Sequence, residues 1–447
     1  MQLADLLRRS DASLGLPARV RACAALQHLL RRLQPYMDVQ GVRRDASAWA
    51  SKVVPQLLTA LGASTAAASP GAGDAQLALA ALGVLGALLQ AVPSTLRAAD
   101  AACEAALVAV MTHAAEGGCN SGGGGGGGAA ALLAAAECLA QLPRAAGDAD
   151  AWSSLARRVL LSTHETLDAL LLGLEGAPWD PRARSLLAPG LGAPGPAGLL
   201  PPRAGLPAAR QHQACRALLA GLVHCLEAMC SRPYPVAVPV PGYSVLAVAA
   251  RLLQFDGGLA LASGAVPHAA SALAPLLALQ PALHATGLQL LELLMSAAGG
   301  QLLTLQGSMA RLLCEQLRGI RLGGAAALAA QPPALRQQLY ATASRFLTAA
   351  GFGVLSGLGV EVLGSCLVEL YGRAAGAADG QAGAAAAAAP GLAGGGQARK
   401  KQKTGGQGLS RRQRDGTEGV FWWWEGQGLW LCNSLHPSLT PWTLLQL

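Results

Sequence analysis

The sequence predicts an all-α protein in which helical hairpins follow one another along the chain. Apolar residues recur at three- and four-residue steps through most of it, the spacing of one face of a helix. Alanine and leucine, both strong helix formers, are in excess, and 52% of the residues are hydrophobic. The β-branched residues that a large sheet would need are scarce; isoleucine occurs only at Ile320.

Residues 134–176 illustrate the expected unit. Pro143 ends a first helix, because proline lacks the amide hydrogen and clashes with the preceding turn. Gly147 and Asp148 fill the break, and Asp150 is the expected N-cap of the next helix. That helix carries one recurring face of largely apolar residues, Leu155, Val159, Thr163, Leu167, Leu170, Leu171 and Leu174. This is an αα-hairpin, and a succession of them without a fixed period predicts an irregular α-solenoid of HEAT/armadillo-like hairpins.

The remaining helices are expected at similar intervals. The predicted ranges are 2–9, 17–34, 49–61, 77–92, 96–113, 208–229, 244–255, 269–297 (kinked near Pro281), 301–318 and 333–373 (broken around 351–359). A charged break is expected from Asp38 to Asp45, and the glycine tract 122–128 is expected to be a loop.

Domain organisation follows from the shifts in composition. Residues 1–373 form the expected helical-repeat domain, with flexible loops near 115–128 and 178–207. Residues 374–419 are a low-complexity linker with basic clusters. Residues 420–447 hold five of the eight tryptophans and form an atypical tail, which we interpret as a read-through or mis-joined terminus rather than a native one; a partner-binding tail is the alternative.

The sequence favours a protein that is not an enzyme and that carries no cofactor. No motif unites a nucleophile with a base and an orienting acid. The spacing of His212, Cys215, His224, Cys225 and Cys230 matches no standard zinc site. The ten cysteines include no CxxC pair and fit a reducing compartment. The best membrane candidate, residues 77–89, is too short to span a bilayer, so no membrane association is expected.

Two basic clusters lie in the linker. They consist of Arg399, Lys400, Lys401 and Lys403, then Arg411, Arg412 and Arg414. Short runs of this kind are typical of nuclear localisation signals, with RNA contact as the second interpretation and a solvated charge run as the simplest one. The predicted location is the nucleus.

Two further patterns bear on partners. LxxLL occurs six times, at 3–7, 26–30, 85–89, 167–171, 273–277 and 290–294; core packing of leucine-rich helices explains these copies better than docking into a partner's groove. The second pattern is an extended, proline-rich segment that cannot be helical and that we expect to pack along the solenoid or at a subunit interface. Its residues are Tyr234, Pro235, Val236, Val238, Pro239, Val240 and Pro241.

Three segments together resemble the Rix-type pre-rRNA-processing proteins, whose animal members are called proline-, glutamic acid- and leucine-rich proteins. The first carries a Cys-Leu-x-x-Leu-Pro turn, a tryptophan and a long helix ending in Gly173-Leu174-Glu175; the signature residues are Cys138, Leu139, Leu142, Pro143 and Trp152. The second is the Pro-Val-x-Val-Pro-Val stretch 235–240, which leads into a helix with Arg251-x-Leu253. The third is a helix, Pro93, Leu96-Arg97 and a second helix.

The resemblance implies a non-enzymatic scaffold of the nucleolus and nucleoplasm that acts in large ribosomal subunit (60S) biogenesis and in processing of internal transcribed spacer 2. It implies as partners a WD-repeat propeller subunit, a second helical-repeat subunit, a Midasin-type ATPase, the pre-60S particle and pre-rRNA. The chain lacks the family's long acidic, proline-rich tail. Two alternatives remain open: a transcriptional coregulator, and an armadillo/HEAT-type nuclear transport or cargo adaptor. The adaptor predicts a Trp/Asn ladder, yet asparagine occurs only at Asn120 and Asn433.

Overall fold

The computed structural model describes residues 15–66, 72–117, 126–171, 199–200, 208–255, 270–351, 354 and 357–371. In these ranges the chain is helical, with turns between the helices and no strand, which confirms the all-α prediction. By contacts along the backbone, the chain divides into two units, Met1–Ala387 and Ala388–Leu447. All the described residues belong to the first unit. The basic clusters and the Trp-rich tail lie outside the described residues.

The helices of the first half alternate with short 3₁₀ turns. They are α2 (Leu16–Leu33), η1 (Gln34–Tyr36), α3 (Gln40–Ala66), α4 (Ala72–Ala91), η2 (Pro93–Ala99), α5 (Asp100–Gly117), α6 (Gly126–Gln141), η3 (Leu142–Ala145) and α7 (Ala149–Leu171). The second half contains α9 (Ala208–Ser231), α10 (Gly242–Leu253), α12 (Ala270–Ala297), η4 (Gly299–Gln301), α13 (Leu302–Ala330) and α14 (Pro333–Ala350). Residues 357–371 form a last described helix.

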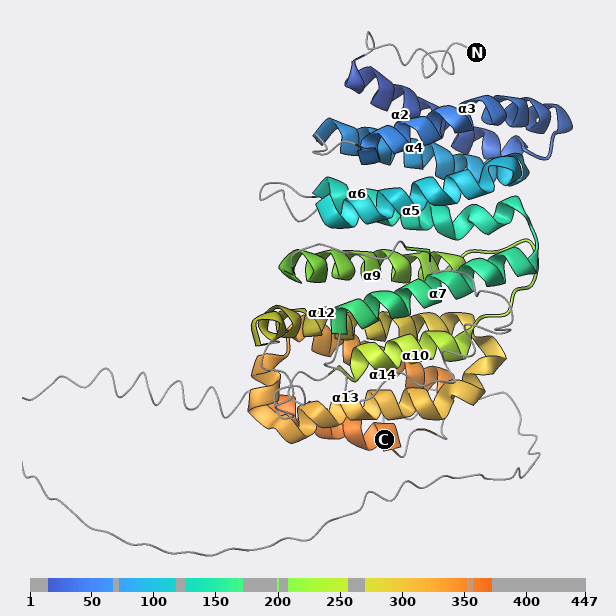
Figure 1. Ribbon diagram of the computed structural model, residues 1–447. Coiled ribbons are helices and arrows are strands. Elements are labelled where there is room, and N and C mark those ends of the chain that lie inside the picture. Colours follow the sequence, from blue (N-terminus) through green and yellow to red (C-terminus); the bar gives the residue numbers. More distant parts are fainter. Residues whose placement is uncertain are drawn as a thin grey trace, which may run out of the picture. The chain divides into compact units, whose positions relative to one another are not determined.

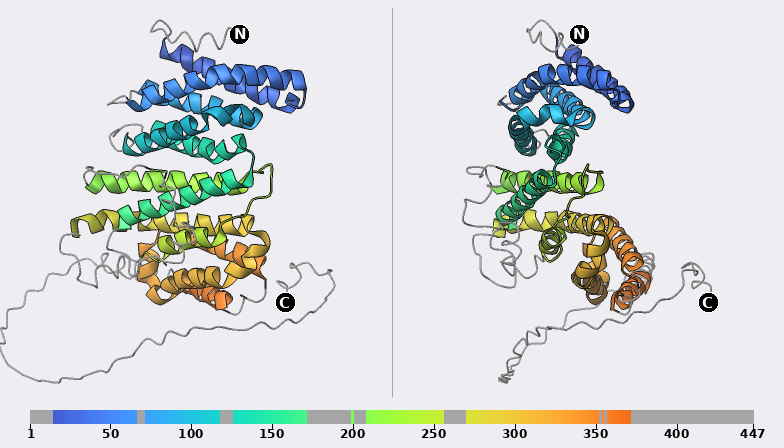
Figure 2. Two further views of the ribbon diagram at one scale, coloured as in Figure 1. Left: turned by 45° about the vertical axis from the view of Figure 1, so that its right-hand side comes forward. Right: turned by 90° about the vertical axis from the view of Figure 1, so that its right-hand side faces the viewer.

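The helices of this unit pack in two rows (Figure 1). In one row α2, α4, α6, α9, α12 and α14 each contact the next. In the other row α3 contacts α5, α7 contacts α10, and α10 contacts α13. The rows are joined by contacts of α3 with α4, α5 with α6, α7 with α9, α10 with α12 and α13 with α14 (Figure 2). Each helix therefore buries its apolar face mainly against helices close to it in sequence.

Two glycines allow neighbouring helices to approach closely, one within the first row and one between the rows. A Cβ atom on Gly221 of α9 would lie 2.8 Å from Leu132 Cδ2 of α6. A Cβ atom on Gly287 of α12 would lie 2.8 Å from Leu253 Cγ of α10. Neither distance is compatible with ordinary packing, so any side chain at these positions would push the neighbouring helix away.

Several helices are longer than the sequence predicts. The expected charged break at 38–45 is wrong beyond residue 39, because α3 begins at Gln40. Likewise, the end of the glycine tract is helical, since α6 begins at Gly126. α13 continues past the predicted end at residue 318 to Ala330, across a non-helical residue at Gly324. In each case the expected boundary followed local propensity, which packing against neighbouring helices can override.

Three described segments are long and apolar enough to cross a membrane by length and composition alone: Asp74–Ala91, Pro93–Gly117 and Arg210–Ser231. The first includes residues 77–89, so the expectation that this region is too short fails, because α4 has 20 residues. Packing accounts for the apolar character instead. Leu82, Leu85, Leu88 and Leu89 of α4 are at most 1% exposed, among the neighbouring helices α2, α3 and α6.

Candidate functional site

The break between α6 and α7 is a tight turn, residues 142–148, that we call the junction turn. α6 ends at Gln141 and Pro143 opens the 3₁₀ turn η3, as expected from its effect on a helix. Gly147 has a φ of 79°, a conformation that favours glycine. The expectation that Asp150 is the N-cap of α7 is wrong. The cap is Asp148, whose Oδ1 accepts a hydrogen bond from the Ala151 amide at 2.7 Å. The turn at Gly147 lets α7 begin at Ala149, one residue before Asp150.

Two side chains from distant parts of the chain bind the carbonyl groups of the junction turn. Arg97, at the end of η2, donates from Nε to Ala145 O at 3.2 Å and from Nη2 to Ala146 O at 2.5 Å. The Tyr234 hydroxyl lies 2.8 Å from Pro143 O and 2.9 Å from Asp148 O. A phenol has one proton to donate, so these two carbonyls share it. Burial and the nearby Asp148 carboxylate raise the pKa of Tyr234.

The junction turn also donates a hydrogen bond to the segment that carries Tyr234. Arg144 of the junction turn donates from Nη2 to Pro233 O at 3.1 Å. Two turns earlier, Glu137 of α6 forms an ion pair with Arg232, which directly follows the end of α9. The three segments that carry the family resemblance therefore meet at one place: η2, the α6–α7 turn and the start of the proline-rich segment. Sequence reasoning singled out each segment but gave no sign of their contact, because 48 to 91 residues separate the bonded partners.

The signature residues themselves belong to the core. Leu139 is fully buried, and Trp152, Leu142 and Cys138 are 1%, 2% and 3% exposed. Cys138 Sγ donates to Leu82 O of α4 at 3.3 Å, and burial raises the pKa of its thiol to about 12. Pro143 is also buried. These residues fix the packing of α6, α7 and α4, and their side chains are not available to a partner.

The proline-rich segment, residues 233–241, is the exposed part of this region. Pro235, Val236, Ala237 and Pro239 are exposed, whereas Val238 packs partly against the core. The segment is not helical, as expected. No backbone group of residues 235–239 has a hydrogen bond to another described residue. The segment thus combines apolar side chains with unused peptide groups at the surface, which is the composition that extended-peptide recognition uses.

The far end of the segment is fixed through α10. Arg251 of α10 is a buried side chain that donates to Asp168 Oδ1 of α7 at 2.7 Å and to His164 O at 3.3 Å. Arg251 Nη1 also lies 3.0 Å from Nδ1 of the fully buried His164. At the start of α10, a Cβ on Gly242 would lie 2.9 Å from Leu305 Cδ1 of α13. The exposed segment therefore runs between two fixed points, Tyr234 and α10.

The other predicted sites have structural roles or lie elsewhere. In the described LxxLL copies most leucines are buried, including Leu85, Leu88, Leu89 and Leu290, as the core interpretation predicted; the copy at 3–7 is outside the described residues. Cys215 and Cys225 are buried, and His224 lies 3.6 Å from Glu227. Within the described ranges, no three His, Cys, Asp or Glu side chains are grouped closely enough to hold a metal ion. The nuclear localisation residues at 399–414 are outside the described residues.

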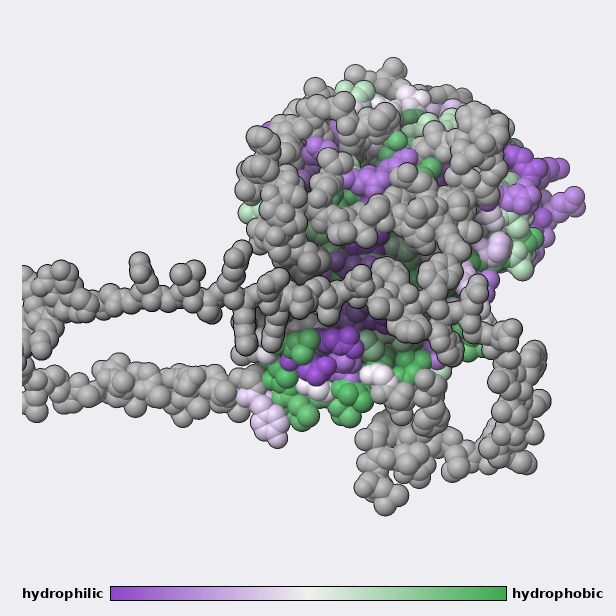
Figure 3. Space-filling view, turned by 60° about the horizontal axis from the view of Figure 1, so that its bottom comes forward, coloured by the Kyte–Doolittle hydropathy of each residue, from purple (hydrophilic) through white to green (hydrophobic). Residues whose placement is uncertain are grey.

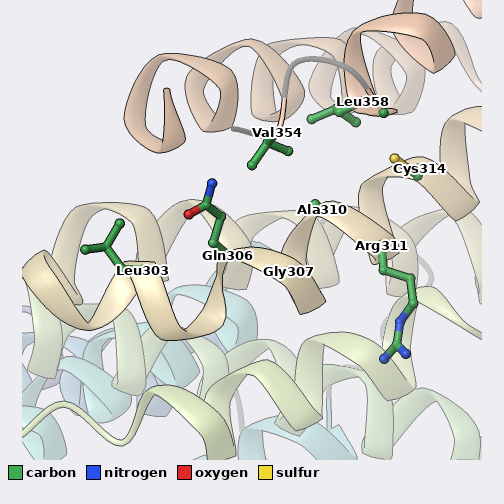
Figure 4. A pocket seen from close by; sticks show the side chains of 9 residues that line it. Leu303, Gln306, Gly307, Ala310, Arg311, Cys314, Val354 and Leu358 are labelled. Carbon is green, nitrogen blue, oxygen red and sulfur yellow. The ribbon is translucent and has the colours of Figure 1, made fainter. Parts of the chain in front are cut away.

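One pocket of about 410 Å³ lies between α13 and residues 354–358 (Figure 4). Leu303, Gln306, Ala310 and Arg311 line it from α13, and Leu358 lies opposite. Cys314 also lines the pocket. Burial raises the pKa of its thiol, Glu361 raises it further, and Arg318 lowers it. A thiol of this kind is protonated at neutral pH, so the pocket has the character of an apolar groove rather than that of a reactive site.

No protein-family model matches the sequence, and a search of curated proteins found no match.

Proposed function

We propose that the chain is a non-enzymatic α-solenoid scaffold of a nuclear complex that acts in large ribosomal subunit biogenesis, as the resemblance to the Rix-type proteins implies. The observation that carries the proposal is the meeting of the three resembling segments around the junction turn. Arg97, Tyr234 and Arg144 join these segments, so the resemblance falls on one continuous region of the unit.

The helix arrangement supports the same class. Two rows of helices whose main contacts are with neighbours in sequence are the expected packing of stacked helical hairpins. Such an array offers a long surface for several partners at once, which is what a scaffold needs. Within it, the exposed residues Val236 and Ala237 of the proline-rich segment are our proposed contact with a partner subunit.

The test is affinity purification of the tagged full-length chain from nuclear extract, with mass spectrometry of the co-purifying proteins. We expect a WD-repeat subunit, a second helical-repeat subunit, a Midasin-type ATPase and large-subunit ribosomal proteins. Recovery of import receptors with varied cargo and no ribosomal proteins would replace this proposal with the transport adaptor. Recovery of transcription factors alone would replace it with the coregulator.

A double variant locates the contact. Val236→Asp with Ala237→Asp puts two charges on the exposed part of the segment and should remove one partner subunit from the purified complex. The matched control is Leu303→Asp with Leu322→Asp, because both leucines are exposed, at 72% and 71%, on α13. Circular dichroism should show that both variants retain their helical content. Equal recovery of all partners by the segment variant contradicts the assignment of the contact.

A further inference from the structure

Charge is unevenly distributed over the described helices. Residues 15–52, which form α2, η1 and the first half of α3, carry seven Lys and Arg side chains against two Asp, an excess of five positive charges. The described residues from α4 to α7 carry four Arg against nine acidic side chains, an excess of five negative charges. The mild net charge of the chain therefore conceals a strongly basic first pair of helices. A local field of this sign attracts polyanions.

The basic side chains are at the surface around the turn between α2 and α3. Arg31, Arg32, Arg43 and Arg44 are all exposed. Among the described residues, Arg31 and Arg32 have no ion-pair partner. Arg43 and Arg44 have only loose ones: their closest carboxylate oxygens, of Asp38 and Asp45, lie 3.8 and 3.7 Å away, and all four side chains are mostly exposed. These charges are free to meet an external anion.

Stabilisation of the fold does not explain all four arginines. Arg31 and Arg32 lie in the last turn of α2, where cations interact favourably with the helix dipole. Arg43 and Arg44 lie near the start of α3, whose first turn has no acidic residue, and there cations oppose the dipole. Arg43 has a structural role in its bond to Met37 O at 2.9 Å, whereas Arg44 has only the loose pair with Asp45 and opposes the dipole of its own helix.

An exposed aromatic ring lies within the cluster. Tyr36 of η1 is 60% exposed, between the two arginine pairs in sequence. Its position is set by the turn: Val39 N donates to Tyr36 O at 3.0 Å and Arg43 Nε donates to Met37 O at 2.9 Å. Surfaces that bind unpaired nucleic acid usually combine two features. Arginines contact the phosphates, and an exposed aromatic ring stacks on a base.

We propose that the surface formed by Arg31, Arg32, Tyr36, Arg43 and Arg44 binds single-stranded or looped RNA through its phosphates and one stacked base. The preference for RNA over DNA rests on the proposed function. The RNA surface itself is separate from the proline-rich segment and needs no partner subunit, so it can be tested with the purified protein alone.

The experiment is fluorescence anisotropy with the full-length chain and a labelled single-stranded RNA of about 20 nucleotides, at salt concentrations from about 50 to 200 mM. The background is a chain in which the seven basic residues of 399–414 are replaced by Gln, so that only the helical unit is measured. The test variant is Arg31→Gln, Arg32→Gln, Arg44→Gln, which leaves the Arg43–Met37 bond intact. The control removes the same charge from exposed arginines elsewhere: Arg210→Gln, Arg216→Gln, Arg311→Gln.

The test variant should lose about 10- to 50-fold in affinity, and the slope of log K against log salt should fall by about 2, because three phosphate contacts are lost. Tyr36→Ala should weaken binding by about 5-fold or more with the slope unchanged, since stacking releases no counterions. The control should bind as the parent does.

Equal losses in the test and control variants would overturn the proposal, because they would mean that net charge alone attracts RNA. No measurable binding by the parent would overturn it as well. A third result would overturn it: the test variant binds vesicles containing an anionic phospholipid more weakly than the parent does, but binds RNA equally well. The partner would then be a membrane surface. None of these results bears on the purification of the nuclear complex, which judges the proposed function separately.

Discussion

The junction turn and the last described helix are both attached to the rest of the unit, but by different means. The junction turn is bound through its backbone carbonyls by side chains from two distant segments, and α7, which follows it, carries the buried Trp152. The helix of residues 357–371 is bound by ion pairs to two helices: Glu361 accepts from Arg318 at 3.1 Å and from Arg321 at 2.8 Å, both of α13, and Glu369 accepts from Arg336 of α14 at 2.9 Å. The first is held through its main-chain carbonyl groups, and the second mainly through its carboxylate side chains.

The outer face of that last helix differs as well. Its exposed side chains are apolar and recur at helical spacing: Val360, Leu363, Leu367, Leu370 and Tyr371, each at least 51% exposed. Figure 3, which looks towards this end of the unit, shows hydrophobic side chains gathered beside hydrophilic ones there. At the other end, the exposed side chains of α2 and α3 include five arginines, Arg21, Arg31, Arg32, Arg43 and Arg44. A polar outer face suits a terminal helix of an array, and an apolar face is normally covered by another layer.

The comparison predicts that the largest loss of stability comes from the centre of the junction. Trp152→Ala should destabilise the unit by about 3–5 kcal/mol, because it removes a large buried ring and leaves a cavity. Urea denaturation followed by circular dichroism measures this. Trp49→Ala is the control, since Trp49 of α3 is only partly buried, and it should cost clearly less. Equal losses would mean that the junction is no more critical than the edge of α3.

Loss of one polar contact of the junction should have a smaller effect. Tyr234→Phe removes the hydroxyl that Pro143 O and Asp148 O share, and should cost about 1 kcal/mol. Tyr243→Phe is the matched control, because Tyr243 is 58% exposed on α10, and it should change stability by less than about 0.5 kcal/mol. If both variants unfold at the same urea concentration, the hydroxyl does not hold the proline-rich segment in place.

The smallest effect is expected at the last helix. The arginine partners of Glu361 are 52% and 38% exposed, so Glu361→Gln should cost about 1 kcal/mol or less. The hydrogen bond from Arg321 is the largest of the influences that lower the pKa of Glu361 below its ordinary value of 4.5. The carboxylate therefore stabilises the fold above about pH 4.5, and the contribution is lost as the pH falls through the lower, folded pKa.

Unfolding curves of the parent and of Glu361→Gln should accordingly converge as the pH is lowered below 4.5 and remain separate at neutral pH. Glu315→Gln provides the control, because Glu315 Oε1 lies 4.0 Å from Arg311 in an exposed pair. A constant difference between parent and Glu361→Gln at all pH values would exclude ionisation as the cause.

The features that could be predicted from the sequence are those that depend on local backbone sterics. Pro143 ends α6, the prolines of 233–241 keep that segment out of a helix, and the helix beginning at Pro333 ends next to Gly351. The prediction failed at Asp150, because the positive φ of Gly147, and with it the start of α7, depends on how the turn packs. It gave no indication of the bond between Tyr234 and the junction turn, because a periodic pattern contains no information on which surface residues meet across 91 positions.

The two fixed ends of the proline-rich segment have a mechanical consequence. Tyr234 holds one end on the turn before α7, and Arg251 holds α10 on α7 itself. Between them, residues 235–239 have no hydrogen bond to another described residue. Both anchors lie on α7 and the turn before it, so we expect a displacement of α7 to move Tyr234 and α10 together.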